Sequence, residues 1–232
     1  MSRNSSNIAT LYPGVLTICT YTEFAPFSYK TEGKIVGTDI NYLKTFANYL
    51  NLDVNIITKS FSKLWEAPGN NECDIAASGI MARNDRHIGA HAQWSNPYME
   101  VIRSLLIRSE DINRFQTPSD FIDKRIVVTP DSTAHIDAIQ RYQPIGAIIL
   151  PFVPSQDEIV NQLIDNKIDA FAEGNISNKY LENAYRDKDE KTILSLTDLH
   201  VMEPKETLNF IVRTNNNSLL DCLNKFIEIN SY

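Results

Sequence analysis

Apolar and polar residues follow one another along the chain in a pattern that predicts strands alternating with helices. Strand-like runs, in which apolar positions alternate with polar ones or form short apolar blocks, cover residues 15–21, 53–58, 74–77, 101–107, 125–129, 147–150, 169–174 and 210–213. Apolar residues three or four positions apart, typical of amphipathic helices, lie within residues 40–50, 136–142, 159–164 and 219–227. We expect Thr38 or Asp39 to cap the first of these helices, Pro130-Asp131-Ser132-Thr133 to open the second, and a capping box at Ser155-Gln-Asp-Glu158 to open the third. Alternation of this kind predicts an α/β fold.

The pattern occurs twice, which predicts two lobes of similar construction. The segments Asp74-Ile-Ala-Ala-Ser-Gly79 and Asp169-Ala-Phe-Ala-Glu-Gly174 each follow a helix and a polar turn, and in each an aspartate opens a short apolar strand that closes on glycine. A polar, proline-containing stretch at residues 109–120 indicates the first crossing between lobes. The last strand and helix then return to the first lobe. We expect lobe 1 to comprise residues 1–105 and 205–232, and lobe 2 residues 106–204.

Composition narrows the class of protein. The 232 residues carry a net charge of -7 and contain no basic run, which argues against a nucleic-acid groove. No apolar run approaches the ~18 residues of a membrane span. Cys19, Cys73 and Cys222 show no metal-ligand spacing, but they leave open one disulfide with one thiol left over. His87 and His91 lie four residues apart on an expected helix without further ligands nearby, so we expect neither a metal nor a cofactor.

Chemically useful side chains gather where the predicted strands end. In open α/β sheets, ligands lie at the carboxyl ends of the strands. Those ends carry aromatic rings, hydroxyl groups, one arginine and one glutamate, namely Phe24, Phe27, Phe61, Ser78, Arg86, Ser132, Thr133 and Glu173. Together these groups would suit a small zwitterion with an aromatic surface around it.

Arg86 has two interpretations. Asn84 is a suitable N-cap, and a helix starting there places Arg86 in the first turn, where the helix dipole disfavours a cation by ~0.3–1 kcal/mol. Either the arginine is held there to bind a carboxylate, or it is an ordinary exposed residue. The strand that ends at Ser78 and Gly79 would also present free backbone N–H groups at this helix start, which suits an anion.

Several motifs, spread over nearly the whole chain, resemble those of the periplasmic solute-binding proteins of polar amino-acid ABC importers, the family 3 type. The matching segments are Phe24-Ala-Pro-Phe-Ser-Tyr29, Gly37-Thr-Asp-Ile40, Asp74-Ile-Ala-Ala-Ser-Gly79 with Asp85-Arg86, Trp94-Ser-Asn-Pro-Tyr98, Asp131-Ser-Thr133 and Asp169-Ala-Phe171. The resemblance implies a two-lobed, periplasmic-binding-protein-like (type II) α/β fold, with a hinge of two strands and a ligand cleft between lobes that close.

The resemblance also implies roles for individual residues. Phe24 and Phe61 match positions that stack on the ligand. Arg86 matches the arginine that pairs bidentately with the ligand's α-carboxylate, a geometry that a guanidinium fork suits. Ser78 and Thr133 match further polar contacts. The implied function is capture of an amino acid or similar small zwitterion, without catalysis, and its delivery to a membrane ABC permease.

Location and assembly follow from the same resemblance. The polar start, residues 1–6, has no apolar signal-peptide core. We therefore expect a monomeric periplasmic protein whose secretory signal has been removed; a cytoplasmic protein is the alternative.

Three positions depart from the family pattern. Met81 stands where Ser or Thr is usual, and Arg83 takes the place of a common Thr. The acid that accepts the ligand's α-ammonium group falls, without a gap, on Gly174, whereas a one-residue gap brings Glu173 onto it. A ligand other than a simple α-amino acid therefore stays open.

The same superfamily contains enzymes. Residues 74–80 and 58–61 also resemble cyclohexadienyl dehydratase, which aromatises prephenate or arogenate. That reaction needs an acid to protonate a departing hydroxyl group while carbon dioxide leaves, and Glu173 would serve if burial raised its pKa. As an ammonium acceptor, the same residue would have to stay ionised. A third alternative is a sensor subunit that binds a ligand and docks to a receptor.

Overall fold

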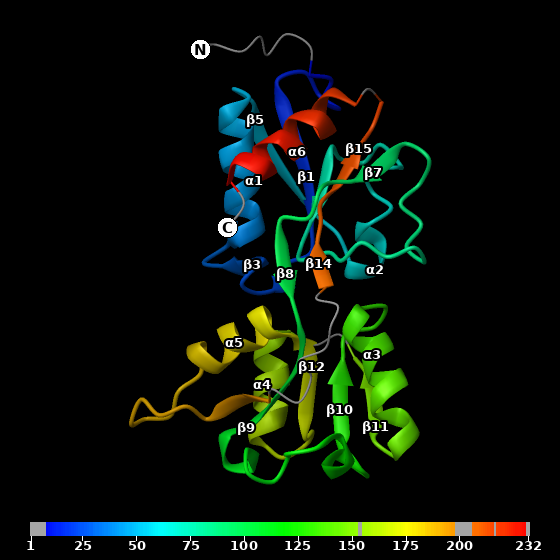
Figure 1. The fold of residues 1–232 in the computed structure, drawn as a ribbon. Coiled ribbons are helices and arrows are strands. Elements are labelled where there is room, and N and C mark those ends of the chain that lie inside the picture. Colours follow the sequence, from blue (N-terminus) through cyan, green and yellow to red (C-terminus); the bar gives the residue numbers. More distant parts are fainter. Residues whose placement is uncertain (1–7, 153–154, 198–205, 216, 231–232) are drawn as a thin grey trace. The chain divides into compact units, whose positions relative to one another are not determined.

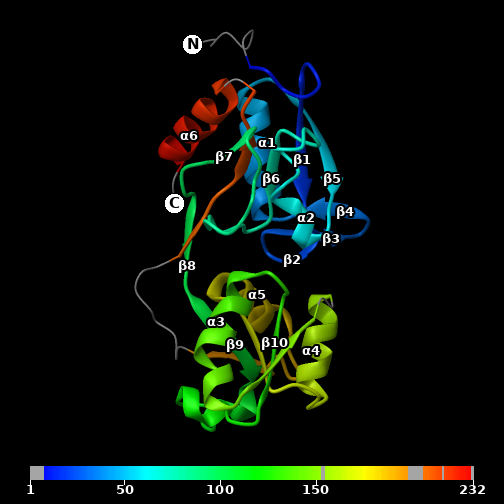
Figure 2. The same cartoon turned by 90° about the vertical axis from the view of Figure 1, so that its right-hand side faces the viewer.

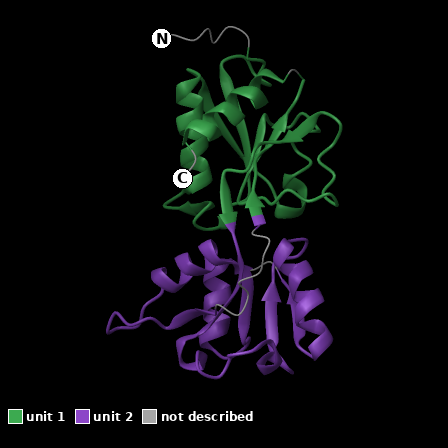
Figure 3. Ribbon diagram, viewed as in Figure 1, with its two compact units in different colours: residues 1–100, 207–232 green, residues 101–206 purple. Residues whose placement is uncertain are grey.

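The chain forms two compact units, each with its own sheet (Figure 3). A computed structural model describes residues 8–152, 155–197, 206–215 and 217–230. One unit comprises Met1–Glu100 with Thr207–Tyr232, and the other comprises Val101–Glu206. The sequence placed the first boundary at residues 105/106, five residues later than the structure does. The second expected boundary, at residues 204/205, lies outside the described residues.

Unit 1 is built on a five-stranded mixed sheet with the order β5-β1-β6-β15-β7 (Figures 1 and 2). The first three of these strands run parallel, and β15 pairs antiparallel with both β6 and β7. Their bounds are β1 Val15–Thr20, β5 Asp53–Thr58, β6 Ile75–Ala77, β7 Ala92–Trp94 and β15 Ile211–Arg213. A small antiparallel sheet follows β1 and consists of β2 Glu23–Phe24, β3 Ser28–Thr31 and β4 Lys34–Val36.

Helices cover the sheet of unit 1. Among the described residues of this unit, the helices are α1 Thr38–Tyr49, α2 Phe61–Leu64 and α6 Ser218–Asn230. Helices α1 and α6 lie side by side and pack through Phe46 and Phe226, whose ring centroids are 5.3 Å apart (Figure 2). A separate cluster joins Leu64 of α2 to Cys19 of β1 and Ala76 of β6. Both cysteines of this cluster, Cys19 and Cys73, are buried thiols and Cys222 is half-buried, and no disulfide forms among the described residues.

Unit 2 has a second five-stranded sheet with the order β11-β10-β12-β9-β13. Its strands are β9 Arg103–Arg108, β10 Arg125–Val128, β11 Ile148–Pro151, β12 Ala170–Gly174 and β13 Leu194–Thr197. Its helices are α3 Thr133–Arg141, α4 Gln156–Ile164 and α5 Asn175–Ala184, with short 3-10 turns at Ser109–Asp111, Pro118–Phe121 and Gln143–Ile145.

The alternation of side chains along the strands of unit 2 decides which helix covers which face. Ile126 and Val128 of β10 pack in one cluster with Ala134 and Ala138 of α3. The intervening Val127 packs in another cluster, with residues of α4 and α5. Successive side chains of a strand point to opposite faces, so helices are required on both sides of this sheet.

The chain passes between the units twice, and both crossings lie in one pair of strands. β8 Met99–Val101 and β14 Glu206–Leu208 form a two-stranded sheet. The strand-like run expected over residues 101–107 corresponds to the end of β8 and to β9, with Ile102 between the two strands.

The aspartate that opens each repeated motif has a structural role. Asp74 is fully buried, pairs with Arg213 at 3.0 Å, and accepts hydrogen bonds from the backbone N–H groups of Leu11 at 2.6 Å and Thr17 at 2.9 Å. In unit 2, Asp169 accepts from the backbone N–H of Arg125 at 2.9 Å. Each aspartate thus joins the strand it precedes to the neighbouring parallel strand, which explains why the motif occurs in both halves.

The helix starts predicted from the sequence are found in unit 2, whereas the predicted N-cap of α1 in unit 1 differs from the observed one. The hydroxyl groups of Ser132 and Ser155 accept hydrogen bonds from the backbone N–H groups three residues later, as N-caps do. The expected N-cap of α1 at Thr38 or Asp39 is wrong, because the N-cap is Gly37. Gly37 has φ +132°, and a Cβ on it would lie 2.2 Å from the carbonyl oxygen of Phe27, so no side chain fits there.

Candidate functional site

Four of the residues expected to bind a ligand meet at the carboxyl ends of β1 and β6. The rings of Phe24 and Phe27 are 5.1 Å apart. A Cβ on Gly79 would lie 2.7 Å from Phe24 and 2.9 Å from Phe27, and Gly79 has φ +56°. The hydroxyl of the fully buried Ser78 shares a hydrogen bond with that of Ser28 at 2.6 Å. The two rings therefore depend on a glycine at position 79 for their present packing.

Arg86 is buried beside two aromatic rings. Its side chain is 5 % exposed, and its guanidinium carbon lies 4.9 Å from the ring centroid of Trp65 and 5.5 Å from that of Phe61. Its Nη1 donates a hydrogen bond to the carbonyl of Met81 at 2.8 Å. The interpretation of Arg86 as an exposed arginine is therefore wrong, and the rings hold the guanidinium by cation–π contact.

The segment that carries Arg86 is not helical. No helix occurs within residues 82–91, so the expected N-cap at Asn84 and the expected helix carrying His87 and His91 are both wrong. Asp85, the neighbour of Arg86 in the sequence, accepts two hydrogen bonds from Arg83, at 2.9 and 2.8 Å. Arg86 therefore meets no unfavourable helix dipole, and tertiary contacts with Trp65 and Phe61 hold its side chain.

Asp39 belongs to this part of unit 1, although the sequence analysis missed it as a site residue. Its carboxylate is 1 % exposed and accepts hydrogen bonds from the Gly79 backbone N–H and the Tyr98 hydroxyl, each at 2.8 Å. Burial raises the pKa of the Asp39 carboxyl to about 7, against the lowering effect of these two hydrogen bonds. The segment Gly37-Thr-Asp-Ile40, one of the motifs that resemble the family, was the available signal.

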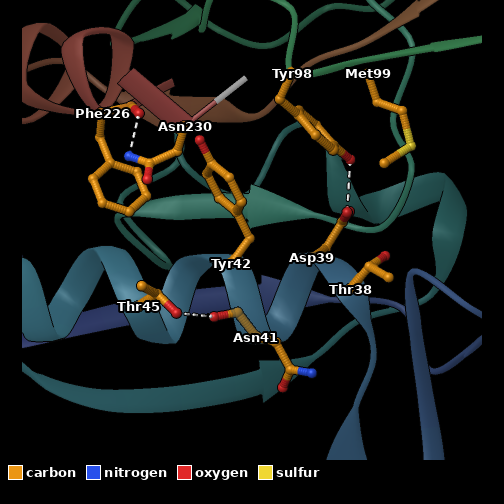
Figure 4. Close-up of a pocket in the computed structure, with 9 residues that line it drawn as sticks. All are labelled: Thr38, Asp39, Asn41, Tyr42, Thr45, Tyr98, Met99, Phe226 and Asn230. Atoms are coloured by element: carbon orange, nitrogen blue, oxygen red, sulfur yellow. Dashed lines mark hydrogen bonds between the residues drawn. The ribbon is translucent and has the colours of Figure 1, made fainter. Parts of the chain in front are cut away.

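Beside Asp39 lies a cavity of about 460 Å³ that belongs to unit 1 alone (Figure 4). It is lined by residues of α1 and α6, by the residue before β8 and by the first residue of β8, namely Thr38, Asp39, Asn41, Tyr42, Thr45, Tyr98, Met99, Phe226 and Asn230. None of the nine residues predicted from sequence to bind a ligand lines it. The rings of Tyr42, Tyr98 and Phe226 pack against one another there, with Tyr42 at 6.1 Å from Tyr98 and 5.3 Å from Phe226.

The raised pKa of Asp39 predicts a pH dependence of stability. The folded chain keeps the Asp39 proton up to about pH 7, whereas an exposed aspartate loses it near pH ~3.9. The contribution of the protonated carboxyl to stability is therefore fully present below about pH 4 and is lost as the pH rises through about 7. In Asp39→Asn the side chain stays uncharged, so urea unfolding should show the variant gaining on the wild type as the pH rises over this range. A difference between the two proteins that stays constant with pH would contradict the assignment.

In unit 2, the two expected hydroxyl residues stand at the start of α3. Ser132 is 5 % exposed and its hydroxyl is used as the N-cap, accepting from the His135 backbone N–H at 3.0 Å. Thr133 is the first residue of α3 and is half-buried. Glu173 is the last residue but one of the neighbouring parallel strand β12, so Thr133 and Glu173 lie at the same edge of the sheet.

Glu173 lies in a cluster of three charged side chains of unit 2, which we call the Arg103 cluster: Arg103, Glu173 and Glu206. Glu173 is 7 % exposed and accepts a hydrogen bond from the Gly174 backbone N–H at 2.8 Å. Arg103 lies 3.5 Å from Glu173 and 2.6 Å from Glu206. Burial raises the pKa of Glu173, and the charge of Arg103 opposes that shift. Arg103 and Glu206 carry no sequence signal of this pairing, since they are about 100 residues apart.

Two observations bear on other classes of site. No group of histidine, cysteine and acidic side chains suited to a metal ion occurs among the described residues, and His200 lies outside them. In the part of the chain that the structure describes, no helix has the length and apolar character needed to cross a membrane.

The sequence model of the bacterial extracellular solute-binding proteins, family 3, matches residues 16–231, and the chain belongs to this family. The predicted family is thereby confirmed. Solved structures confirm the fold, the type II periplasmic-binding-protein fold: an arginine-bound substrate-binding protein of Streptococcus pneumoniae superposes with a TM-score of 0.78 at 21% identity, covering 93% of this chain and 88% of that one. An ancestral arginine-binding protein bound to arginine gives 0.79 at 22% identity over 93% and 92%.

The matches to curated relatives are shorter and cover only part of each chain. Cyclohexadienyl dehydratase of Pseudomonas aeruginosa is 26% identical over 162 residues, which are 68% of this chain and 59% of the enzyme. A probable histidine-binding protein of Neisseria gonorrhoeae is 29% identical over 97 residues, 41% of this chain and 35% of that protein. The matches thus span between about a third and three fifths of these relatives' lengths.

Proposed function

We propose that this solute-binding protein captures an amino acid or a similar small carboxylate and delivers it to a membrane ABC permease. The observation that carries the proposal is the burial of Arg86 beside the rings of Phe61 and Trp65. A buried cation costs free energy unless it is compensated, and a ligand carboxylate would add a bidentate partner to this guanidinium. The rings would at the same time offer a surface for the apolar part of the ligand.

The remaining ligand contacts belong to the proposal as well. In unit 1, Phe24, Phe27, Ser78 and Gly79 would surround the ligand near Arg86. In unit 2, Ser132 and Thr133 would offer the start of α3, although the Ser132 hydroxyl already serves as the N-cap. Glu173 would accept the ligand's ammonium group. The arginine-bound structural neighbours support an amino acid as the ligand class, without fixing its side chain.

A thermal-shift panel of the common L-amino acids tests the proposal. A ligand present at ~100 times its dissociation constant stabilises the folded chain by roughly 2.7 kcal/mol, which corresponds to a rise in Tm of about 5–10 °C for a chain of this size. We expect one chemically related group of amino acids to give such a shift. A panel without any shift would contradict the proposed ligand class.

A second candidate function is the dehydration of prephenate or arogenate. It is favoured by Glu173, whose carboxyl is buried with a raised pKa, as a proton donor to a departing hydroxyl group requires. The identity to a cyclohexadienyl dehydratase points the same way.

Glu173→Gln separates the two functions. If Glu173 accepts an ammonium group, the variant should lose affinity for the amino acid found in the panel, because an amide cannot supply the negative charge. If Glu173 is a proton donor, the variant should bind prephenate yet fail to form the aromatic product, which is followed by its ultraviolet absorbance. A wild-type protein that forms no aromatic product from either cyclohexadiene would exclude the enzyme.

The family description places its members outside the cell, and we propose a periplasmic monomer whose partner is an ABC permease. A sensor subunit, which would bind the same ligand and dock to a receptor, is distinguished by uptake: transport of the ligand should fail in cells that lack the protein.

A further inference from the structure

In the Arg103 cluster, the arginine lies closer to one glutamate than to the other. Arg103 Nε lies 2.6 Å from Glu206, whereas Arg103 Nη1 lies 3.5 Å from Glu173. Charge-assisted N–H···O bonds are normally about 2.7–2.9 Å long. Arg103 lies nearer to Glu206 than to Glu173, but neither Arg103 Nε nor the facing Glu206 oxygen makes a hydrogen bond within the described residues, so both pairings act through charge attraction, the one with Glu173 from the greater distance. Both Arg103 and Glu173 have side chains less than a tenth exposed, so their mutual attraction is weakly screened.

A glycine borders the Arg103 guanidinium. In the antiparallel register of β9 and β12, Arg103 stands directly opposite Gly174. A Cβ on Gly174 would lie 3.4 Å from Arg103 Nη2 and 3.8 Å from the Cβ of Val101. A longer side chain at position 174 would thus occupy the space that the guanidinium now borders.

The cluster also determines how much negative charge Glu173 can offer. With all three groups ionised, the cluster holds one positive and two negative charges. An ammonium ion approaching Glu173 would have to share that carboxylate with Arg103, which lies 3.5 Å away, and would be repelled by the guanidinium. A stronger ion pair between Arg103 and Glu206 leaves the Glu173 carboxylate more available to the ligand's ammonium group. A weaker ion pair leaves it less available.

We propose that Arg103 is a specificity-determining residue, whose guanidinium competes with the ligand's ammonium group for the Glu173 carboxylate while Glu206 limits that competition. The inference rests on the proposed function, in which Glu173 faces the ligand. It deepens that function by naming the ligand class: carboxylic acids that carry either an α-amino or an α-hydroxyl group. Arg103 already compensates the charge of Glu173. Binding of a ligand without an ammonium group therefore does not leave the buried Glu173 carboxylate without a counter-ion.

Matched pairs of ligands test the inference by isothermal titration calorimetry. Suitable pairs are L-alanine with L-lactate, L-leucine with L-2-hydroxyisocaproate, and L-phenylalanine with L-phenyllactate, chosen by the side chain that the thermal-shift panel favours. For each protein we compare the dissociation constant of the hydroxy acid with that of the amino acid. This ratio should be below about 10 in the wild type. A hydroxy acid lacks the ammonium group and so loses its attraction to the Glu173 carboxylate, but that attraction is already reduced because Arg103 compensates the carboxylate.

Two substitutions should move the ratio in opposite directions. Arg103→Met removes the competitor and should raise the ratio at least tenfold. Glu206→Gln leaves Arg103 to pair with Glu173 alone and should lower the ratio by weakening amino-acid binding. Arg114→Met, which removes a cation from unit 2 whose side chain is 59% exposed, is the matched control and should leave the ratio unchanged.

The results separate this inference from the proposed function. A ratio in Arg103→Met within twofold of the wild type, or a rise in Glu206→Gln, would overturn the role of Arg103 even though amino acids bind. A wild type that binds neither member of any pair would overturn both. If Arg103→Met fails to fold, Arg103→Lys keeps the charge without the guanidinium fork and should still shift the ratio upward by about threefold; an unchanged ratio in that variant overturns the inference.

Discussion

Replacing Arg86 by alanine is expected to weaken ligand binding by ~2–5 kcal/mol, which is the range for breaking a buried, hydrogen-bonded charge pair. This corresponds to a loss of affinity from roughly 30-fold to several thousand-fold. The reason is that the guanidinium, 5 % exposed between Phe61 and Trp65, would provide the charge for the ligand carboxylate. Calorimetric titration with the amino acid that gives the largest thermal shift measures the effect.

Arg83→Ala is the matched control for Arg86→Ala. Arg83 stands three residues earlier and pairs with Asp85 at 2.8 Å, so its loss should change affinity by no more than a few fold. The Tm of both ligand-free variants should be measured as well, because loss of the contacts to Phe61 and Trp65 will lower the stability of Arg86→Ala. An unchanged ligand affinity in Arg86→Ala would remove this residue from the site.

The largest expected loss of stability follows from Asp74→Ala. The substitution leaves Arg213 buried without its carboxylate and frees two backbone N–H groups, those of Leu11 and Thr17. Breaking a buried ion pair by removing one partner costs about 3–5 kcal/mol. Urea unfolding followed by circular dichroism should show this loss as a lower midpoint.

Asp85→Ala provides the control for Asp74→Ala, since Asp85 also pairs with an arginine but its side chain is 60% exposed. Surface pairs contribute at most about 1 kcal/mol. If Asp74→Ala unfolds at the same urea concentration as Asp85→Ala, then Asp74 does not join β1 and β6 in the way that its hydrogen bonds indicate.

Much of the fold could be predicted from the sequence, because the spacing of apolar residues within a segment depends on that segment alone. The strand at residues 53–58 coincides with β5 Asp53–Thr58, and the helical pattern from Ile40 to Leu50 corresponds to α1 Thr38–Tyr49. The polar residues Ser132 and Ser155 were recognised as helix starts since their capping bonds span only three residues. The same locality explains why strand ends, and hence candidate ligand contacts, could be identified.

Contacts between residues far apart in the sequence could not be predicted from it. The environment of Arg86 depends on rings about 20 residues earlier in the chain, and a local helix rule gave the wrong backbone for its segment. The burial of Asp39 depends on Gly79 and Tyr98, and the charge state of Glu173 depends on Arg103 and Glu206. In each case the decisive partner lies far along the sequence, where no periodic pattern reports it.

The central claim is that the chain binds its ligand through a carboxylate held by Arg86. The most direct test is a calorimetric titration of the wild-type chain with the best amino acid of the panel and with its methyl ester, which has the same side chain and ammonium group but no carboxylate. The amino acid should bind one per chain, and the ester should bind at least 30-fold more weakly, the lower limit set by ~2 kcal/mol. An ester that binds as tightly as the free amino acid would contradict the account.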